Sequence, residues 1–435
     1  MNTLHKEHIS KLLPCAGYSL LCGSLTGLII FLFKFFAKWA EVFSEKFYVY
    51  ARESFPAVLL LFTILILLAF VMSKIHKAAP ECKGGGIPRS EGILRGVLPF
   101  RWLRTLLGTF WGSMLSFIAG VPVGSEGPAV LIGTSIGRMS NRFSKKKEEN
   151  DTYVMTGGAG AGFAVATGAP LSGILFTLEE IHKFFSPMLV LNVALSVLAA
   201  TGINQMLCNH FGMSPNLFNL DEMAVFTLSH IGYLILFAGL IAVAVAIFDG
   251  SILLFRKFTS HGKKGPIPVK LIVVFVLTGV LGLFFSEGIY SGHHLITHVL
   301  SHNIPVTLLA ILFLVRMVMM LLITDSGATG GIFIPTLAIG VLAAALIARF
   351  LLAIGMPAEL STTVIFLGMC AFIGGTLRAP MTAAILFLEL TGQFTNLFYV
   401  ALVIFIVNFI TELFNLTPFY DKALEEMVEA ENKKN

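Results

Sequence analysis

Three short segments of the sequence share one spacing of glycine and proline. In each of them a proline follows a glycine by four positions: Gly84–Pro88, Gly124–Pro128 and Gly331–Pro335. Proline fits the first turn of a helix, where its missing N–H costs no hydrogen bond, and glycine permits a sharp turn before it. A helix start presents free N–H groups and about half a positive charge, so several starts that meet would hold an anion. Three ordinary junctions between loops and helices are the alternative interpretation.

Glu126 stands inside the second of these segments, between Ser125 and Gly127. An ionised carboxylate at a helix start competes with an anion for the same N–H groups, whereas a protonated one loses that attraction and can move away. We therefore predict that Glu126 is both a gate and a proton carrier. The alternative is a simple N-terminal acid, which the helix dipole stabilises by about 0.3–1 kcal/mol.

The composition predicts that these segments lie in a membrane. Of the 435 residues, 56% are hydrophobic and 13% are charged, whereas soluble proteins have about 25% charged residues. Long runs without charge occupy residues 55–71, 231–248 and 397–410, and a membrane-spanning helix needs about 20 predominantly apolar residues. We predict an all-α polytopic membrane protein in which a buried acid such as Glu126 is costly and therefore functional.

Charge and cysteine usage add orientation and exclude other classes. Basic residues cluster at 138–147 and 256–270, with further lysines at both ends, which predicts that both termini are cytoplasmic. The net charge of +5 then reflects topology, not nucleic-acid binding. The five cysteines form no CxxC pair and are predicted to be small core residues: Cys15, Cys22, Cys82, Cys208 and Cys370.

The chain also contains a weak internal repeat. Two pairs of segments resemble each other: 168–180 with 378–390, and 124–133 with 331–340. The first pair aligns Glu179 with Glu389. The shared order and spacing predict two duplicated halves, about 12–210 and 225–415, with an ion site between them near the middle of the membrane. Chance similarity between helices rich in small residues is the alternative.

Together these motifs resemble the CLC family of chloride channels and chloride/proton exchangers over almost the whole chain. The resemblance rests on GGGIP, GSEGP, SGATGGIFIP (326–335) and the glutamate pair after APLSGILF. It implies one transmembrane domain over 1–435 with the CLC fold, in which two inverted-topology halves of tilted, partly broken helices precede a last helix at about 418–432. It also implies a homodimer in membrane lipid, each subunit with its own pore, in the cell (inner) membrane, of the prokaryotic type without cytoplasmic CBS domains.

The resemblance assigns roles to individual residues. Glu126 matches the external gating glutamate, and Glu180 matches the internal proton-transfer glutamate that is typical of exchangers. The matched anion-binding positions are Gly85, Ile332, Phe333 and Tyr420. The implied function is secondary active antiport of chloride, or a similar monovalent anion, against protons, without enzyme activity, metal or organic cofactor. An uncoupled anion channel of the same fold remains the alternative.

Two positions depart from the family pattern. Gly85 stands where a chloride-coordinating serine is usual, which leaves the preference for chloride over nitrate open. Ser125 stands where an arginine is usual beside the gate, which would alter anion attraction or the titration of Glu126. Tyr420 and the proline after the gate motif resemble chloride-type members more than the fluoride-exporting branch.

Several weaker signals have structural interpretations. The GTSIG segment (133–137) satisfies a GxSxG pattern, so a membrane-embedded serine hydrolase using Ser135 is a remote alternative. The glycines of 157–163 indicate tight helix packing. Arg316 and Glu389 are predicted to hydrogen-bond across helices. Three histidines recur at four-residue steps, favouring a solvated or pH-sensitive segment over a metal site: His294, His298 and His302.

Overall fold

The computed structural model describes residues 2–142, 147–215, 217–218, 223–261, 267–415 and 417–433. Within these residues every regular element is helical. The first half contains α1 (Asn2–Ala51), α2 (Phe55–Ala78), α3 (Ile87–Leu94), α4 (Trp102–Ala119), α5 (Glu126–Asn141), α6 (Lys147–Thr167), α7 (Pro170–Phe176), the π-helical segment η2 (Thr177–His182) and α8 (Pro187–Phe211). The second contains α9 (Ile231–His261), α10 (Ile267–Phe284), α11 (His293–Ser301), α12 (Val306–Ser326), α13 (Phe333–Ala353), α14 (Ser361–Leu377), α15 (Pro380–Thr391) and α16 (Leu397–Leu413), and α17 (Phe419–Asn432) closes the chain.

Eight segments of the described chain are helical, long and apolar enough to cross a membrane. They include the uncharged runs predicted from sequence, which lie in α2, α9 and α16. Large apolar side chains on the outer surface, such as Trp39 and Phe398, remain 59% exposed, as lipid-facing residues do. The prediction of an all-α polytopic membrane protein is confirmed. Lys145, Lys146, Lys263 and Lys264 of the two basic clusters lie outside the described residues.

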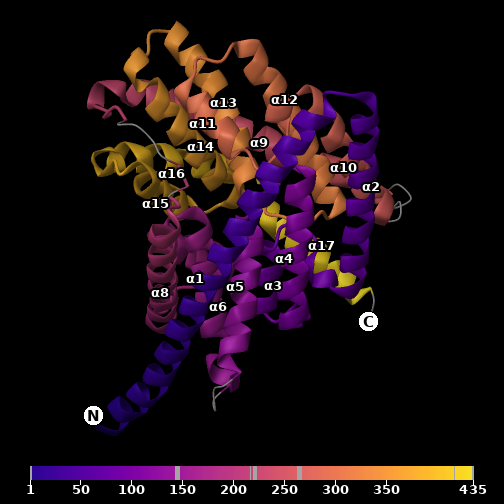
Figure 1. The fold of residues 1–435 in the computed structure, drawn as a ribbon. Coiled ribbons are helices and arrows are strands. Elements are labelled where there is room, and N and C mark those ends of the chain that lie inside the picture. Colours follow the sequence, from indigo (N-terminus) through magenta and orange to yellow (C-terminus); the bar gives the residue numbers. More distant parts are fainter. Residues whose placement is uncertain are drawn as a thin grey trace.

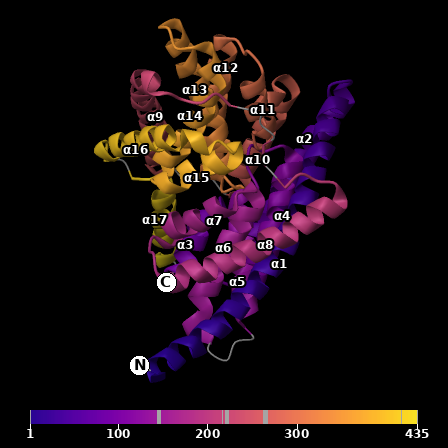
Figure 2. The same cartoon turned by 90° about the vertical axis from the view of Figure 1, so that its left-hand side faces the viewer.

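The two halves of the chain occupy different parts of the molecule. In the views of Figures 1 and 2, α3, α5, α6 and α8 lie in the lower part and α11 to α16 lie in the upper part. The last helix, α17, returns from the second half and packs against α3. This return brings the C-terminal residues beside the first glycine–proline segment.

Two glutamates hold the halves together by a reciprocal exchange. The Glu389 carboxylate of α15 accepts hydrogen bonds from the first turn of α7, from Leu171 N at 2.7 Å and from Ser172 N and Oγ at 2.7 and 2.6 Å. The Glu179 carboxylate, beyond the end of α7, accepts the equivalent bonds from α15, which come from Met381 N at 3.1 Å and Thr382 N and Oγ1 at 2.8 and 2.7 Å. Each acid therefore satisfies the free N–H groups at a helix start of the opposite half.

Small residues allow the helices of the first half to pack closely. A Cβ atom added at Gly133 of α5 would overlap the carbonyl of Gly158 in α6, and one at Gly162 would overlap the carbonyl of Ala129. The predicted role of the 157–163 glycines in helix packing is thus confirmed. All five cysteines are buried free thiols, as predicted for core residues.

Candidate functional site

The starts of α5 and α13 lie against each other. Gly124 and Gly331, which precede these helices, exchange two backbone hydrogen bonds, with N···O distances of 2.6 and 2.7 Å. The segment before α3 joins them, because Gly84 N donates to Gly327 O at 3.1 Å and Gly330 N donates to Gly84 O at 3.4 Å. All three glycine–proline segments therefore meet at one place, and each proline lies in the first turn of its helix.

Glycine is required where these backbones touch. Gly86 has a φ of +79°, and a Cβ atom there would overlap the carbonyl of Gly127. A Cβ atom at Gly127 would in turn overlap the carbonyl of Gly85. Any side chain at these two positions would force the starts of α3 and α5 apart.

Glu126 is the first residue of α5, and its side chain is fully buried. Its Oε1 accepts a hydrogen bond from Ser125 Oγ at 3.1 Å. The carboxylate folds back over Gly124, where it would overlap an added Cβ atom. Its Oε2 is buried and has no hydrogen-bond partner among the described residues. The acid thus lies at the meeting point of the helix starts with one oxygen unsatisfied.

Ile332 and Phe333 lie at the start of α13, where Ile332 is the N-cap residue and Phe333 is the first helical residue. Their N–H groups belong to the first turn, which has no partners inside the helix. The Phe333 ring packs edge-on against Phe163 of α6 with ring centroids 5.1 Å apart, which fixes the start of α13 against the first half. A Cβ atom added at Gly85 would be 3.7 Å from the Ile332 side chain, so α3 and α13 also adjoin here.

Tyr420 lies in the first turn of α17 and is 1% exposed. It belongs to the same buried apolar cluster as Ile332 and Phe333. Its hydroxyl is buried and has no hydrogen-bond partner in the described part of the chain. Burial raises the pKa of this hydroxyl, and the negative charges of Glu180 and Glu126 raise it further.

Glu180 lies in η2, directly after α7, and is 3% exposed. Segments of π-helix are rare and are frequently found at functional sites. Its Oε1 is buried and lacks a partner among the described residues. The neighbouring Glu179 is used to cap α15, so the two adjacent acids have separate surroundings. The structure thus brings all the predicted site residues to the zone where the helix starts meet or to its flank at η2.

Sequence reasoning missed three residues beside Glu180. Glu91 of α3, Asp421 of α17 and Lys183 after η2 lie together with it. Glu91 and Asp421 are far from Glu180 along the chain, whereas Lys183 is three residues after it, and none of the three belongs to a repeated motif. The local signals were that Asp421 follows Tyr420 directly and that Lys183 is three residues after Glu180.

Known proteins share this arrangement and sequence pattern. The profile of the family described as "Voltage gated chloride channel" matches residues 67–412. The H(+)/Cl(-) exchange transporter ClcA of Salmonella paratyphi B is 32% identical over 394 residues, which cover 86% of this chain and 80% of that protein. The chain belongs to the voltage-gated chloride channel family, or CLC family.

Solved structures agree with this family assignment. A slow cyanobacterial Cl-/H+ antiporter superposes with a TM-score of 0.89 at 26% identity, over 96% of this chain and 99% of that chain. A CLC-type fluoride/proton antiporter superposes with a TM-score of 0.77 at 21% identity, over 92% of this chain and 96% of that chain, which shows the shared fold. The CLC fold predicted from sequence is confirmed.

The structure also shows the surroundings of Ser135 and Arg316, which the sequence analysis singled out. Ser135 is buried in α5, and its hydroxyl donates to Leu131 O at 2.8 Å within the helix. The alternative of a serine hydrolase is wrong, since the relatives of this chain are named transporters. Arg316 donates to three carbonyls of one loop, those of Glu287, Ile289 and Tyr290, at 2.8–2.9 Å.

The predicted histidine face is helical only in part. His294 and His298 lie in α11, whereas His302 is its C-cap with extended backbone. The His298 and His302 rings have centroids 4.7 Å apart, and His298 Nδ1 is 3.0 Å from Glu287 Oε1. The group is partly exposed, as a solvated segment is.

Proposed function

We propose that this protein is a secondary active antiporter that exchanges chloride for protons across the membrane. One observation carries the proposal: a fully buried glutamate, Glu126, lies where the starts of three helices meet, and one of its oxygens has no hydrogen-bond partner among the described residues. A group of this kind can hold the anion position when charged and leave it when protonated. The name of the Salmonella relative, an H(+)/Cl(-) exchange transporter, supports the same activity.

The anion is held by partial charges in this mechanism. Chloride lies in the centre of the pathway, bound by the N–H groups of Ile332 and Phe333 and by the Tyr420 hydroxyl. The two N–H groups are donors at a helix start, and the hydroxyl is a buried donor that has no partner within the described part of the chain. Partial charges bind the ion weakly enough for it to leave again. Gly85 contributes only its backbone to this site.

Glu126 couples the two ions because its charge competes with chloride. When ionised, it occupies the outer anion position and accepts hydrogen bonds from the N–H groups at the helix starts. When it binds a proton, it loses this attraction and swings away, so that an anion replaces it. Each cycle therefore moves a proton on Glu126 in exchange for anion passage.

Glu180 supplies the other end of the proton route. It lies in η2 of the first half, outside the glycine–proline segments that surround Glu126. We propose that it exchanges protons with the cytoplasm while the anion takes a separate path. The cytoplasmic assignment follows the positive residues: Arg256 of the second basic cluster pairs with Glu426 of α17 at 3.2 Å, so this cluster and the C-terminal helix share one side. Both termini are then cytoplasmic, and the protein acts as a homodimer in lipid with one pore in each subunit.

Flux in proteoliposomes tests the proposed function. An outward chloride gradient is expected to drive proton uptake against a proton gradient, because the two fluxes are opposed and coupled. Valinomycin with potassium sets the voltage, and protein-free liposomes give the leak. Chloride flux without uphill proton movement would instead identify an uncoupled channel.

Two substitutions separate the proposed roles of the glutamates. In Glu180→Gln, proton movement is expected to stop while chloride flux continues, because the internal proton site is lost and the anion path is intact. In Glu126→Gln, both coupling and the pH dependence of chloride flux are expected to vanish, because the gate stays neutral. Unchanged proton transport in Glu180→Gln would refute its assignment.

A further inference from the structure

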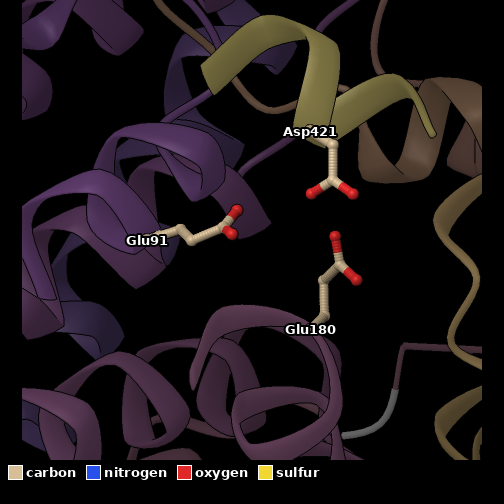
Figure 3. A group of neighbouring side chains, drawn as sticks. All are labelled: Glu91, Glu180 and Asp421. Carbon is tan, nitrogen blue, oxygen red and sulfur yellow. The ribbon is translucent and has the colours of Figure 1, made fainter. Parts of the chain in front are cut away.

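Three carboxylates from distant parts of the chain converge beside the anion pathway. Glu91 of α3, Glu180 of η2 and Asp421 of α17 each offer an oxygen within 4.8 Å of the others. Figure 3 shows the three side chains pointing toward one another from separate elements. Glu91 and Glu180 are 1% and 3% exposed, whereas the Asp421 side chain is 33% exposed. Asp421 therefore forms the outer member of the group.

Two cations contact these acids. Lys183 Nζ is in contact with Asp421 Oδ1 and lies 3.4 Å from Glu91 Oε1. Arg95 NH1 lies 2.9 Å from the same Glu91 oxygen. The Lys183 ammonium already contacts two of the acids, so a metal ion would have to displace it. The five groups form a compact cluster of three acids and two bases.

Two buried oxygens of the cluster have no hydrogen-bond partner among the described residues, Glu180 Oε1 and Glu91 Oε2. Both are placed where a proton, once bound, stays shielded from water. Other titratable groups lie around Glu180: Glu179 and His182 are in its own segment, and Tyr420 is in α17. Tyr153 of α6 packs against the apolar cluster that contains Leu178. The Glu179 carboxylate accepts hydrogen bonds from the start of α15, and His182 Nδ1 lies 3.4 Å from Thr156 Oγ1 of α6.

The charge balance of the cluster calls for one proton. Three ionised acids and two bases leave one uncompensated negative charge, which a single bound proton removes. Burial disfavours the Lys183 ammonium, but the surrounding carboxylates, Glu180 first, outweigh burial and raise its pKa. Burial also raises the pKa of the Glu91 carboxyl.

We propose that Asp421 and Lys183 form an ion-pair gate over Glu180, in which Asp421 receives protons from the cytoplasm and passes them inward. This inference rests on the proposed function and extends it to the way in which protons reach the internal glutamate. Asp421 is a proton-carrying residue in this scheme, and Lys183 is the positioning residue that closes the gate.

The exposure of the groups gives the order of the steps. Lys183 is one-third exposed, follows directly after η2, and has a φ of +55° that turns its backbone away from the π segment. A proton from water binds the Asp421 carboxylate and breaks its ion pair with Lys183, whose ammonium stays near Glu91. The Asp421 O–H bond then breaks as the Glu180 O–H bond forms, and one water or a side-chain rotation spans the gap between them. Asp421 regains its charge and its ion pair, so the gate closes behind the proton.

Opposite shifts in pH dependence test this proposal. In Asp421→Asn the cluster is balanced without a proton, so Glu180 binds one only in more acidic solution. The internal pH at half-maximal proton transport is expected to fall by about one unit. In Lys183→Gln two negative charges are uncompensated, and the same midpoint is expected to rise by about one unit. Chloride flux is measured in the same liposomes and is expected to persist.

The double variant Asp421→Asn/Lys183→Gln separates charge balance from proton relay. Its midpoint is expected to return to within a few tenths of a unit of the wild type, because one acid and one base are removed together. Its maximal proton rate is expected to stay several-fold lower, because the side chain at 421 no longer binds a proton. The double variant also keeps the test decisive if either single variant folds poorly.

Lys422→Gln is the matched control. Lys422 neighbours Asp421 but pairs with Glu425 on the same helix at 2.9 Å, and we expect no midpoint shift from its substitution. Midpoints that stay fixed, or that move in the same direction in Asp421→Asn and Lys183→Gln with chloride flux intact, would overturn the gate. Failure of the wild-type protein to pump protons would instead refute the proposed function.

Discussion

At the scale of single residues, the site depends on glycines, because a side chain at these positions would collide with a neighbouring backbone. Gly86 and Gly127 cannot be replaced by a larger residue, because a Cβ atom at either position would overlap a backbone carbonyl. Gly85 differs from both: its φ is not positive, and an added Cβ atom would make an ordinary contact of 3.7 Å with Ile332. The serine that is usual in the family would therefore fit at position 85 without a steric clash.

Restoring the serine is expected to change anion preference. In Gly85→Ser the new hydroxyl fits beside the start of α13 and adds one donor to the anion site. If the hydroxyl bonds only one of the two anions, a hydrogen bond of about 1 kcal/mol changes the ratio of chloride flux to nitrate flux by roughly fivefold. Liposome flux with each anion measures the ratio.

The control for this substitution is Gly86→Ser at the adjacent position. Its side chain would collide with the Gly127 carbonyl, so we expect loss of folded protein. An unchanged chloride-to-nitrate ratio in folded Gly85→Ser would show that residue 85 does not reach the anion.

At the scale of elements, adjacent glutamates have different tasks. Glu179 and Glu389 cap helices of opposite halves, whereas Glu180 keeps an unpartnered oxygen beside the proposed proton route. The Glu389 cap holds the start of α7, and Glu179, which caps α15, lies in η2 next to Glu180. We therefore expect the reciprocal caps to position Glu180 without taking part in transport.

Loss of either cap is expected to lower stability by a similar amount. A neutral side chain in Glu179→Gln or Glu389→Gln keeps one acceptor but loses the charge-assisted bonds, at a cost of about 1–2 kcal/mol. Thermal unfolding in detergent measures the change, with the exposed Glu359→Gln as control. We expect proton coupling to survive in both variants. A decrease no larger than that of the control would contradict the capping role.

Local signals explain which elements could be predicted from sequence. Glycine and proline act within one turn of the backbone, so the starts of α3, α5 and α13 were predictable from GGGIP, GSEGP and GIFIP. Long apolar runs likewise predicted α2, α9 and α16. The partners of the glutamates were not predictable, because Glu179 meets Thr382 and Lys183 meets Asp421 only after the halves have packed.

At the scale of the whole molecule, every residue of the proposed pathway belongs to one chain. Three helix starts come from both halves, and α17 returns to contribute Tyr420 and Asp421 beside α3. None of the proposed roles needs a residue from a second copy. In the proposed homodimer, each subunit should therefore transport independently of its partner.

A covalently linked dimer with Glu180→Gln in one subunit tests this independence. The altered subunit should still pass chloride but move no protons, whereas its partner should exchange both ions. Proton transport is therefore expected to fall to about half that of the linked wild-type dimer, with chloride flux retained. The linked dimer with both subunits altered sets the baseline. Complete loss of proton transport with only one altered subunit would mean that the two subunits share a proton route, which a pathway contained within one chain does not allow.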